Sequence, residues 1–506
     1  MLDYVPKLQS EELPKVPFVF EGISTRFIRE NKVVPLELKN NVLKVLMADP
    51  NDQAAVEALR LAVSADVAVY GGDLKMIDDY IAKFYNQEPQ NINRIIENME
   101  EDVFDFIKDD EDAGRLKDLA SEAPIIKLVN LLISRAAESR SSDIHVEPFE
   151  NELKVRYRID GVLHDIESLP KRLQAAVVSR IKIMSKMNIA ERRLPQDGRI
   201  RVKVGDREID LRVSTIPVLH GESVVMRILD KEGIVVDLDR LGFPMETHAR
   251  FNQLITRPNG IILVTGPTGS GKTTTLYGAL EKINSPDKMI ITVEDPVEYQ
   301  LNGVNQIQIK PQIGLHFANA LRHIVRQDPD IIMIGEIRDL ETAEIAIQAA
   351  LTGHLVFSTL HTNDAPTAIT RLLDMGVEAF LLAATIRGIL AQRLVRVICP
   401  SCKEQEESVT GKGEEAKVGL SPGMPLYRGK GCERCTYTGY YGRSGLFELL
   451  VVDDSLHRLI LKRSDVGDIR EAARKNGMKT LLEDGMDKVR AGITTLGEVL
   501  RVTQEV

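Results

Sequence analysis

The chain of 506 residues contains no tryptophan, only four cysteines and fewer basic than acidic residues. Its 65 Lys and Arg against 75 Asp and Glu give a net charge of −10. Together with the missing tryptophan, this charge disfavours a protein whose main task is binding nucleic acid, because such proteins usually present a basic face. A local basic patch is still compatible with this negative net charge. No apolar run approaches the roughly 20 residues of a membrane-spanning helix, so we expect a soluble chain.

The amino end also lacks the features of an export signal. Residues 1–12 contain neither a basic region nor an apolar one, which predicts a cytoplasmic protein. In a reducing cytoplasm, paired cysteines indicate metal ligation in preference to disulfides. Hydrophobic residues make up 43% and charged residues 28%, an ordinary globular composition. Because single cores stop growing near roughly 250 to 300 residues, we expect three or four domains.

The first part of the chain alternates strand and helix patterns. A strand is predicted over 42–47 and helices over 54–63 and 74–85, so residues 1–85 read as a small α/β module. Residues 86–119 are dominated by acidic side chains with little apolar periodicity, which indicates a flexible linker.

Residues 120–232 are predicted to form an α+β domain that ends near Asp230. Alternating apolar and basic residues indicate strands with an arginine-rich face. The expected elements are a helix beginning at Ser121, a hairpin turning at Asp160-Gly161, a helix over 173–187, and a hairpin of 199–204 with 207–213 turning at Gly205-Asp206.

Residues 240–396 show the pattern of a parallel sheet covered on both faces. Short apolar runs over 261–264, 289–293, 331–334 and 355–357 alternate with helical segments. We assign residues 397–440 to a cysteine-containing module and residues 441–506 to a helical carboxyl-terminal region.

A complete P-loop follows the first of these strands. Its glycines let backbone N–H groups surround phosphate oxygens at the amino end of a helix. Lys272 is expected to reach the β- and γ-phosphates and Thr273 to ligate Mg²⁺, which predicts ATP and Mg²⁺ as cofactors. A glycine-rich turn that binds nothing fits poorly with the full match and both flanks. The predicted nucleotide-binding residues are Gly266, Pro267, Thr268, Gly269, Ser270, Gly271, Lys272, Thr273 and Thr274.

Carboxylates follow two other strands. Glu336 stands where a Walker B strand usually ends in Asp, so it can orient a water or reach Mg²⁺ through water, while direct ligation stays open. An ordinary exposed Glu at a strand end is the alternative. Three further carboxylates are candidates for a general base or for holding Mg²⁺, with helix caps and solvated acids equally compatible: Glu294, Asp295 and Glu298.

Two of the nine histidines, His354 and His361, lie at the two ends of one predicted strand. A single histidine is usually structural, but this placement favours a role for at least one in sensing the γ-phosphate or a neighbouring subunit.

All four cysteines fall in two C-x-x-C pairs. Four thiolates suit a tetrahedral Zn²⁺, and four protein ligands leave no open position for catalysis, so we predict structural zinc. The segment 403–431 between the pairs then forms a loop whose two ends are held together by the metal. Four buried reduced thiols are the alternative. The ligands are Cys399, Cys402, Cys432 and Cys435.

These motifs together resemble those of the secretion ATPases that drive type II secretion and type IV pilus assembly. The P-loop, residues 291–298, 335–339 and 353–362 are similar to that family's Walker A motif, Asp box, Walker B motif and His box, in the same order. The resemblance extends to residues 194–199 and to the cysteine pairs, and covers roughly residues 18–506.

The resemblance implies a PAS-like domain at 120–232, a RecA-like ATPase domain, a ring of six subunits, and an amino-terminal module that docks inner-membrane platform proteins. It also implies that arginines complete the nucleotide site, and planar cations are suited to stabilise a transferring phosphoryl group. By position these are Arg212 and Arg227 from the first domain, and Arg322 with Arg326 on one helix face. A solvated basic face is the alternative, which we favour for Arg199, Arg201 and Arg207.

We therefore predict a cytoplasmic motor ATPase, peripheral to the inner membrane, that couples hydrolysis to pseudopilus assembly and protein export by type II secretion. A type IV pilus extension ATPase is the nearest alternative, and the short amino end favours secretion. A retraction motor fits less well, because such motors generally lack the cysteines. A RecA-like nucleic-acid translocase and a non-hydrolysing ring represent other classes. No repeat of the kind that binds cyclic di-GMP is apparent, so that ligand is not expected.

Overall fold

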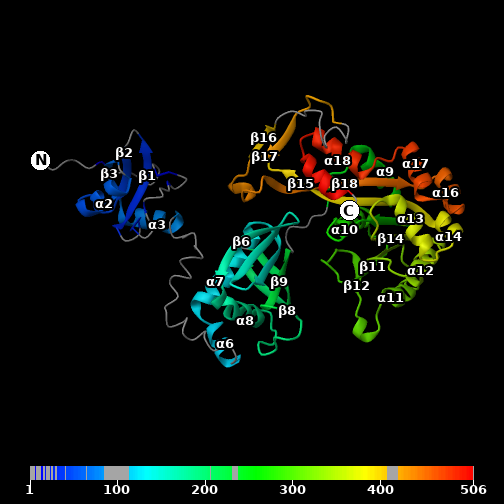
Figure 1. Cartoon of the computed structure of the whole chain (residues 1–506), viewed down its shortest axis with the longest axis horizontal. Coiled ribbons are helices and arrows are strands. Elements are labelled where there is room, and N and C mark those ends of the chain that lie inside the picture. The colour runs from blue at the N-terminus through cyan, green and yellow to red at the C-terminus, as the bar shows by residue number, and fades with distance from the viewer. Residues whose placement is uncertain are drawn as a thin grey trace. The chain divides into compact units, whose positions relative to one another are not determined.

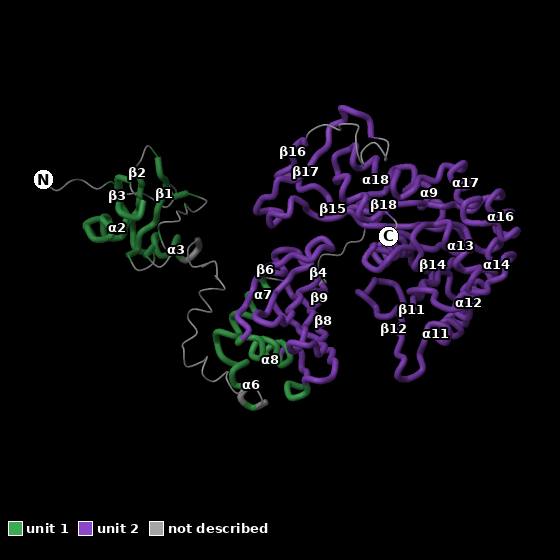
Figure 2. The backbone as a smooth tube through the Cα atoms, in the orientation of Figure 1, with its two compact units in different colours: residues 1–134, 172–183, 188–191 green, residues 135–171, 184–187, 192–506 purple. Residues whose placement is uncertain are grey.

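The fold is that of a computed structural model, which describes residues 31–39, 42–63, 65–84, 113–204, 207–230, 237–406 and 420–504, with a few single positions before residue 31 (Figure 1). Three predicted features lie wholly or partly outside these residues: the acidic linker of residues 86–119 as far as residue 112, the turn at Gly205-Asp206 and the middle of the segment between the cysteine pairs. The rest of the predicted linker forms the helix α6 (Ala113–Leu119), so a flexible linker is wrong for these residues. The chain divides into two compact units (Figure 2). Residues 1–134, 172–183 and 188–191 form the first, and residues 135–171, 184–187 and 192–506 form the second.

The amino-terminal module contains a three-stranded sheet in the order β1-β2-β3, with β1 antiparallel and β3 parallel to β2. Its core includes the fully buried Leu43, Val45 and Ile77. The predicted α/β module is thereby confirmed. Its elements are β1 (Val33–Lys39), β2 (Val42–Met47), α2 (Gln53–Val63), β3 (Asp66–Gly71) and α3 (Leu74–Phe84).

Three further helices follow, α6 (Ala113–Leu119), α7 (Ala123–Glu138) and α8 (Gln174–Met184). α8 ends three residues before the predicted end at Met187. Lys186 has a φ of 60°, a left-handed conformation that no α-helix continues through.

A six-stranded antiparallel sheet has the order β6-β5-β4-β9-β8-β7. The two predicted hairpins, β5 with β6 and β7 with β8, are confirmed. The sequence patterns missed β4 and β9, which pair with each other in the middle of the sheet and so join the hairpins. The strands are β4 (Ser141–Pro148), β5 (Glu152–Ile159), β6 (Val162–Pro170), β7 (Gln196–Val204), β8 (Arg207–Val218) and β9 (Gly221–Asp230).

A seven-stranded sheet follows in the order β12-β11-β13-β14-β10-β15-β18, and all pairs except β15 with β18 are parallel. The predicted parallel sheet is confirmed, while β12, β15 and β18 were not foreseen. The strands are β10 (Gly260–Thr265), β11 (Ile290–Glu294), β12 (Val304–Gln308), β13 (Ile331–Ile334), β14 (Leu355–Leu360), β15 (Ile386–Ile398) and β18 (Tyr440–Val451).

Both faces of this sheet are covered, because alternate residues of β10 belong to different cores. Ile261 and Leu263 join a cluster with residues of α12 and α13, whereas Ile262 and Val264 join one with residues of α9 and α10. The helices are α9 (Met245–Ile255), α10 (Lys272–Ile283), α11 (Phe317–Ile324), α12 (Leu340–Leu351), α13 (Ala365–Asp374) and α14 (Ala379–Thr385).

The region expected to be helical from residue 441 begins instead with most of β18, whose residues Ser444–Leu450 are buried along β15. The sheet thus continues after the cysteine-containing segment, which carries the short strands β16 (Lys403–Glu406) and β17 (Leu426–Gly429). The expected helices then follow as α16 (Asp454–Leu461), α17 (Val466–Lys475), α18 (Leu481–Arg490) and α19 (Leu496–Thr503). No helix in the described parts of the chain combines the length and apolarity needed to cross a membrane.

Candidate nucleotide site and metal centre

The P-loop joins the carboxyl end of β10 to α10. Gly266, Gly269 and Gly271 have φ angles of 149°, 80° and 86°, which side-chain-bearing residues rarely adopt. A Cβ at Gly266 would lie 2.5 Å from the carbonyl oxygen of Gln392, and one at Gly271 would lie 2.8 Å from the Gln392 Nε2. The loop therefore needs all three glycines for its conformation, and Gly266 and Gly271 also for its close contact with β15.

The P-loop lysine is partly enclosed by the loop itself. Lys272 Nζ donates hydrogen bonds to the carbonyl oxygens of Gly266 at 2.7 Å and Pro267 at 3.1 Å. Burial lowers the pKa of Lys272 to about 8, with a further lowering by Arg393 and an opposing effect of Glu336. An anion beside this amine favours its charged form, so phosphate binding and protonation of Lys272 are coupled.

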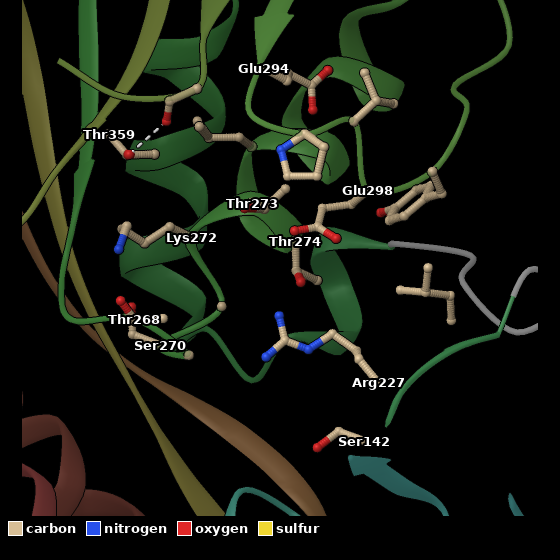
Figure 3. A pocket seen from close by; sticks show the side chains of 18 of the residues that line it. Ser142, Arg227, Thr268, Ser270, Lys272, Thr273, Thr274, Glu294, Glu298 and Thr359 are labelled. Carbon is tan, nitrogen blue, oxygen red and sulfur yellow. Dashed lines mark hydrogen bonds between the residues drawn. The ribbon is translucent and has the colours of Figure 1, made fainter. Parts of the chain in front are cut away.

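The second unit contains a cavity of about 1750 Å³ around the P-loop (Figure 3). It brings together most of the predicted site residues from strands that are far apart in sequence. Those that line it are Pro267, Thr268, Gly269, Ser270, Gly271, Lys272, Thr273, Thr274, Glu294, Asp295, Glu298, Glu336, His361, Arg212 and Arg227.

Glu336 lies just beyond the end of β13, and its side chain is 13% exposed. Its carboxylate is 2.5 Å from Arg338 Nη2 and 3.4 Å from His361 Nε2. Burial lowers the pKa of His361 and the charge of Lys272 lowers it further, so His361 is neutral near pH 7. Glu336 therefore has one firm cationic partner and remains accessible to the cavity.

Glu294 is enclosed more completely than Glu336. Thr292 Oγ1 donates to its Oε1 at 2.5 Å, Gln306 Nε2 donates to the same oxygen at 3.1 Å, and the Tyr277 hydroxyl donates to Oε2. Burial, together with the hydrogen bond to Glu294, raises the pKa of Tyr277. Glu294 is thus a fixed acceptor in the cavity wall, whereas the neighbouring Asp295 and Glu298 are exposed.

The two predicted histidines are separated. His361 follows the carboxyl end of β14, next to Glu336. His354 precedes the amino end of the same strand, where its carbonyl oxygen accepts from Gly260 N and its Nδ1 lies 2.7 Å from the Ala349 carbonyl oxygen. A strand of this length spans about 20 Å. His354 therefore lies at the far end of β14 from the P-loop and does not meet the expectation of a γ-phosphate role within its own chain.

Two of the four predicted arginines line the cavity. Arg212 and Arg227 are directly opposite each other on β8 and β9. Arg227 Nε lies 2.9 Å from Asp143 Oδ1, and its side chain remains 60% exposed. These cations reach the site from the six-stranded sheet and not from the sheet that carries the P-loop.

The other two arginines lie outside the cavity. Arg322 is exposed on α11 and forms an ion pair with Glu341. Arg326 lies two residues beyond Ile324, where that helix ends, and is also exposed. The prediction that both occupy one helix face is therefore wrong for Arg326, and neither contributes to the nucleotide site of its own chain.

Sequence reasoning missed three residues beside the P-loop: Gln392, Arg393 and Arg338. Gln392 Oε1 accepts a hydrogen bond of 2.7 Å from Thr275 Oγ1 on α10, which fixes the helix against β15. Gln392 and Arg393 can be recognised only from the register of β15 against β10. They come directly after Ala391, which pairs with Thr265 at the end of β10. Arg338 had a usable signal, since it is two residues from Glu336.

The four cysteines come together as the C-x-x-C spacing predicted. Their sulfur atoms all lie within 4.8 Å of one another, with separations of 3.8 Å for Cys399–Cys432, 3.9 Å for Cys402–Cys435 and 3.7 Å for Cys432–Cys435. Four thiolates at about 2.3 Å from one tetrahedral ion would be about 3.8 Å apart. Burial raises the pKa of the Cys402 thiol, and the hydrogen bond that Gly431 N donates to its sulfur at 3.3 Å opposes this effect. The group fits a closed, structural metal site.

The parallel sheet, its P-loop and Glu336 define a P-loop ATPase. The profile described as "Type II/IV secretion system protein" matches residues 118–501, and the "MshEN domain" profile matches residues 4–91. The chain belongs to the family of type II/IV secretion system proteins.

Relatives cover nearly the whole chain. It is 54% identical over 500 residues to "Type II secretion system protein E" of Xanthomonas campestris pv. campestris, covering 98% of this chain and 86% of the relative. It is 48% identical to "Type II secretion system ATPase E" of Vibrio cholerae, with 84% and 85% covered, and 43% identical to "Type IV pilus assembly ATPase PilB" of Myxococcus xanthus, with 98% and 88% covered.

Solved structures agree on the fold. The Legionella pneumophila ATPase DotB aligns with a TM-score of 0.56 at 21% identity, covering 74% of this chain and 95% of that chain. A structure of the pilus retraction motor PilT with bound ADP aligns with a TM-score of 0.50 at 26% identity, covering 74% and 96%.

Proposed function

We propose that this chain is the motor of a type II secretion system, hydrolysing ATP to drive pseudopilus assembly and protein export. The observation that carries the proposal is a P-loop cavity whose carboxylates and histidine come from separate strand ends and whose arginines come from the paired strands β8 and β9. The chain is also 54% identical, over 98% of its length, to a type II secretion protein E.

In this proposal Lys272 binds the β- and γ-phosphates and Thr273 ligates Mg²⁺. Glu336 orients the attacking water, because its carboxylate remains accessible to the cavity. The oxygens of Glu294 are instead occupied by side-chain donors, which fits a supporting role in the wall.

The arginines stabilise charge on the transferred phosphoryl group. Arg212 and Arg227 act from the six-stranded sheet, so hydrolysis is coupled to movement of that sheet relative to the P-loop. Arg322 and Arg326, which are exposed and do not line the cavity of their own chain, act in the site of a neighbouring copy in a ring of six. Such a ring would place two sets of arginines at each nucleotide.

The metal centre and the amino-terminal module serve assembly in this proposal. The cysteine cluster binds one structural Zn²⁺, the ion that four thiolates in a tetrahedron prefer. The amino-terminal module docks the secretion platform at the inner membrane, which places the motor in the cytoplasm and peripheral to that membrane.

Hydrolysis is tested with the purified full-length chain. Phosphate release with Mg²⁺ should be abolished by Lys272→Ala and reduced at least about hundredfold by Glu336→Gln. Lys282→Ala is the matched control, because this lysine lies at the other end of the same helix and its side chain is 41% exposed. Equal turnover by wild type and Lys272→Ala would contradict the proposal, and strong stimulation by DNA would favour a nucleic-acid translocase.

A type IV pilus assembly motor is the second candidate, favoured by the 43% identity to a PilB over 98% of the chain. The two are separated in cells of the source organism. Deletion of the gene should abolish export of secreted enzymes while leaving piliation and twitching intact, and Lys272→Ala should fail to restore export. Loss of pili with normal export would assign the chain to pilus assembly instead.

A further inference from the structure

Arg393 is a buried cation beside the P-loop that belongs to none of the recognised motifs. It lies on β15, two positions after the residue that pairs with Thr265, and lines the nucleotide cavity. Only 8% of the residue is exposed. A Cβ added to Gly266 would lie 3.1 Å from its Nη1, so the guanidinium is in close contact with the start of the P-loop.

The hydrogen-bond partners of Arg393 are all neutral. Nη1 donates to the Gln392 carbonyl oxygen at 3.1 Å, and Nη2 donates to the carbonyl oxygen of Asn363 at 2.9 Å and to its Oδ1 at 3.3 Å. Across the described ranges, no carboxylate oxygen forms an ion pair with this guanidinium. A buried charge without a counter-charge is costly, and burial accordingly lowers the pKa of Arg393.

The two carboxylates whose charges act on Arg393, Asp364 and Glu448, form hydrogen bonds to other groups. Asp364 accepts from Thr367 N at 2.8 Å and forms an ion pair with Arg470. Glu448 accepts from Ala365 N at 2.8 Å. Each therefore stabilises the amino end of α13 and only partly offsets the charge of Arg393.

The cavity thus holds two like charges close enough to affect each other. The field of Arg393 contributes to the lowered pKa of Lys272, and both residues line the cavity. An anion in the cavity would relieve this repulsion. Because Arg393 is shielded from water, its field is weakly screened.

We propose that Arg393 is a further positioning residue of the nucleotide site, whose buried charge is balanced by the polyphosphate and favours the more highly charged nucleotide. The proposal rests on the nucleotide site described above. Electrostatic attraction increases with each phosphate charge, so Arg393 strengthens ATP binding more than AMP binding. Its bonds to Asn363 hold the guanidinium in place before the nucleotide arrives.

Arg387 provides a closely matched control on the same strand. It donates to the Asn259 carbonyl oxygen at 3.4 Å, to Asn259 Oδ1 at 3.3 Å and to the Ala384 carbonyl oxygen at 3.0 Å. It contacts Gly260, at the opposite end of β10 from the P-loop, and is absent from the cavity lining. Burial also lowers its pKa. The two arginines therefore share neutral hydrogen-bond partners and a lowered pKa, but Arg387 is less buried and lies at the other end of β10 from the nucleotide.

The test measures ATP, ADP and AMP affinities of the full-length chain by displacement of a fluorescent ATP analogue. Arg393→Gln should weaken ATP binding at least about tenfold, ADP binding less and AMP binding less than about threefold. Arg393→Lys should keep the ratio of ATP to AMP affinity within about threefold of wild type, since it retains the charge. Arg387→Gln should change none of the three affinities.

Thermal melting establishes that each variant is folded. Equal weakening of all three nucleotides by Arg393→Gln, or unchanged affinities, would overturn the proposal, because a structural role carries no charge dependence. If Arg393→Gln does not fold, Arg393→Lys decides: a folded variant that has lost the preference for ATP refutes the role of the charge. A wild-type chain that binds no nucleotide would instead refute the ATPase function itself.

Discussion

ATP affinity should fall with rising pH because of the environment of Lys272. The perturbation is a change from pH 7 to pH 9 at constant salt. Burial lowers the pKa of Lys272 to about 8, so in the free protein the amine loses its proton within this range. Bound phosphate restores the ammonium form, which means that binding above pH 8 must take up a proton.

The size of the effect follows from this titration. For a pKa of about 8, the charged fraction is about 0.9 at pH 7 and about 0.1 at pH 9, so ATP affinity should fall about tenfold, equivalent to about 1.4 kcal/mol. The sign is set by the direction of the shift: a lowered lysine pKa leaves affinity intact below pH 8 and reduces it above. His361 does not interfere, because burial lowers its pKa from 6.5.

The assay is equilibrium binding of a fluorescent ATP analogue at pH 7, 8 and 9, with melting curves to show that the chain stays folded. Lys272→Arg is the control, since a guanidinium stays charged throughout and its affinity should be independent of pH. A wild-type affinity that stays constant from pH 7 to pH 9 would refute the reasoning. So would an equal fall in Lys272→Arg, which would point to another titrating group.

Three further predictions concern the loop, the sheet and the metal. Gly266→Ala should lose more nucleotide affinity and more thermal stability than Gly269→Ala. The reason is that a Cβ at Gly266 would lie 2.5 Å from a carbonyl oxygen, while nothing lies within 4 Å of one at Gly269. Equal losses would show that only the φ angles determine the effect of these substitutions. Burial raises the pKa of Glu448 to about 7, so its protonated form stabilises the fold at low pH. As the pH rises from 4.5 to 7, the wild type should therefore lose up to about 3 kcal/mol of unfolding free energy. Denaturant titrations of Glu448→Gln should show a smaller loss over the same range. Cys402→Ser should lower bound zinc, measured by metal analysis, from about one ion per chain and lower the melting temperature; unchanged metal content would exclude this ligand set.

Local patterns identified four strands of the parallel sheet, β10, β11, β13 and β14, and the P-loop, because both depend on short-range chemistry. Apolar runs such as 261–264 and 331–334 must be buried on both faces, and the spacing of Gly266, Gly271 and Lys272 is itself the phosphate-binding geometry. The C-x-x-C pairs likewise predicted the cysteine cluster, because each pair already supplies two ligands at a fixed separation.

The strands that were missed are those whose stability comes from distant partners. β18 was assigned to a helical region, yet it pairs along most of β15 from across the cysteine-containing segment. β4 and β9 pair with each other although eighty or so residues of chain separate them, and such pairing leaves no short-range signal. The positions of Gln392 and Arg393 follow from β15 and were hidden for the same reason.

The sequence by itself determined the phosphate-binding loop, the metal-binding cysteines and the strands β10, β11, β13 and β14, since each follows from residues close together in the chain. Only the tertiary structure decided which of the remaining charged residues belong to the site. It placed His361 beside Glu336 and His354 at the other edge of the sheet, enclosed Glu294 with donors, and buried Arg393 against Gly266. Burial, strand register and the partner of each charge arise from long-range packing, and these are the quantities that local patterns do not contain.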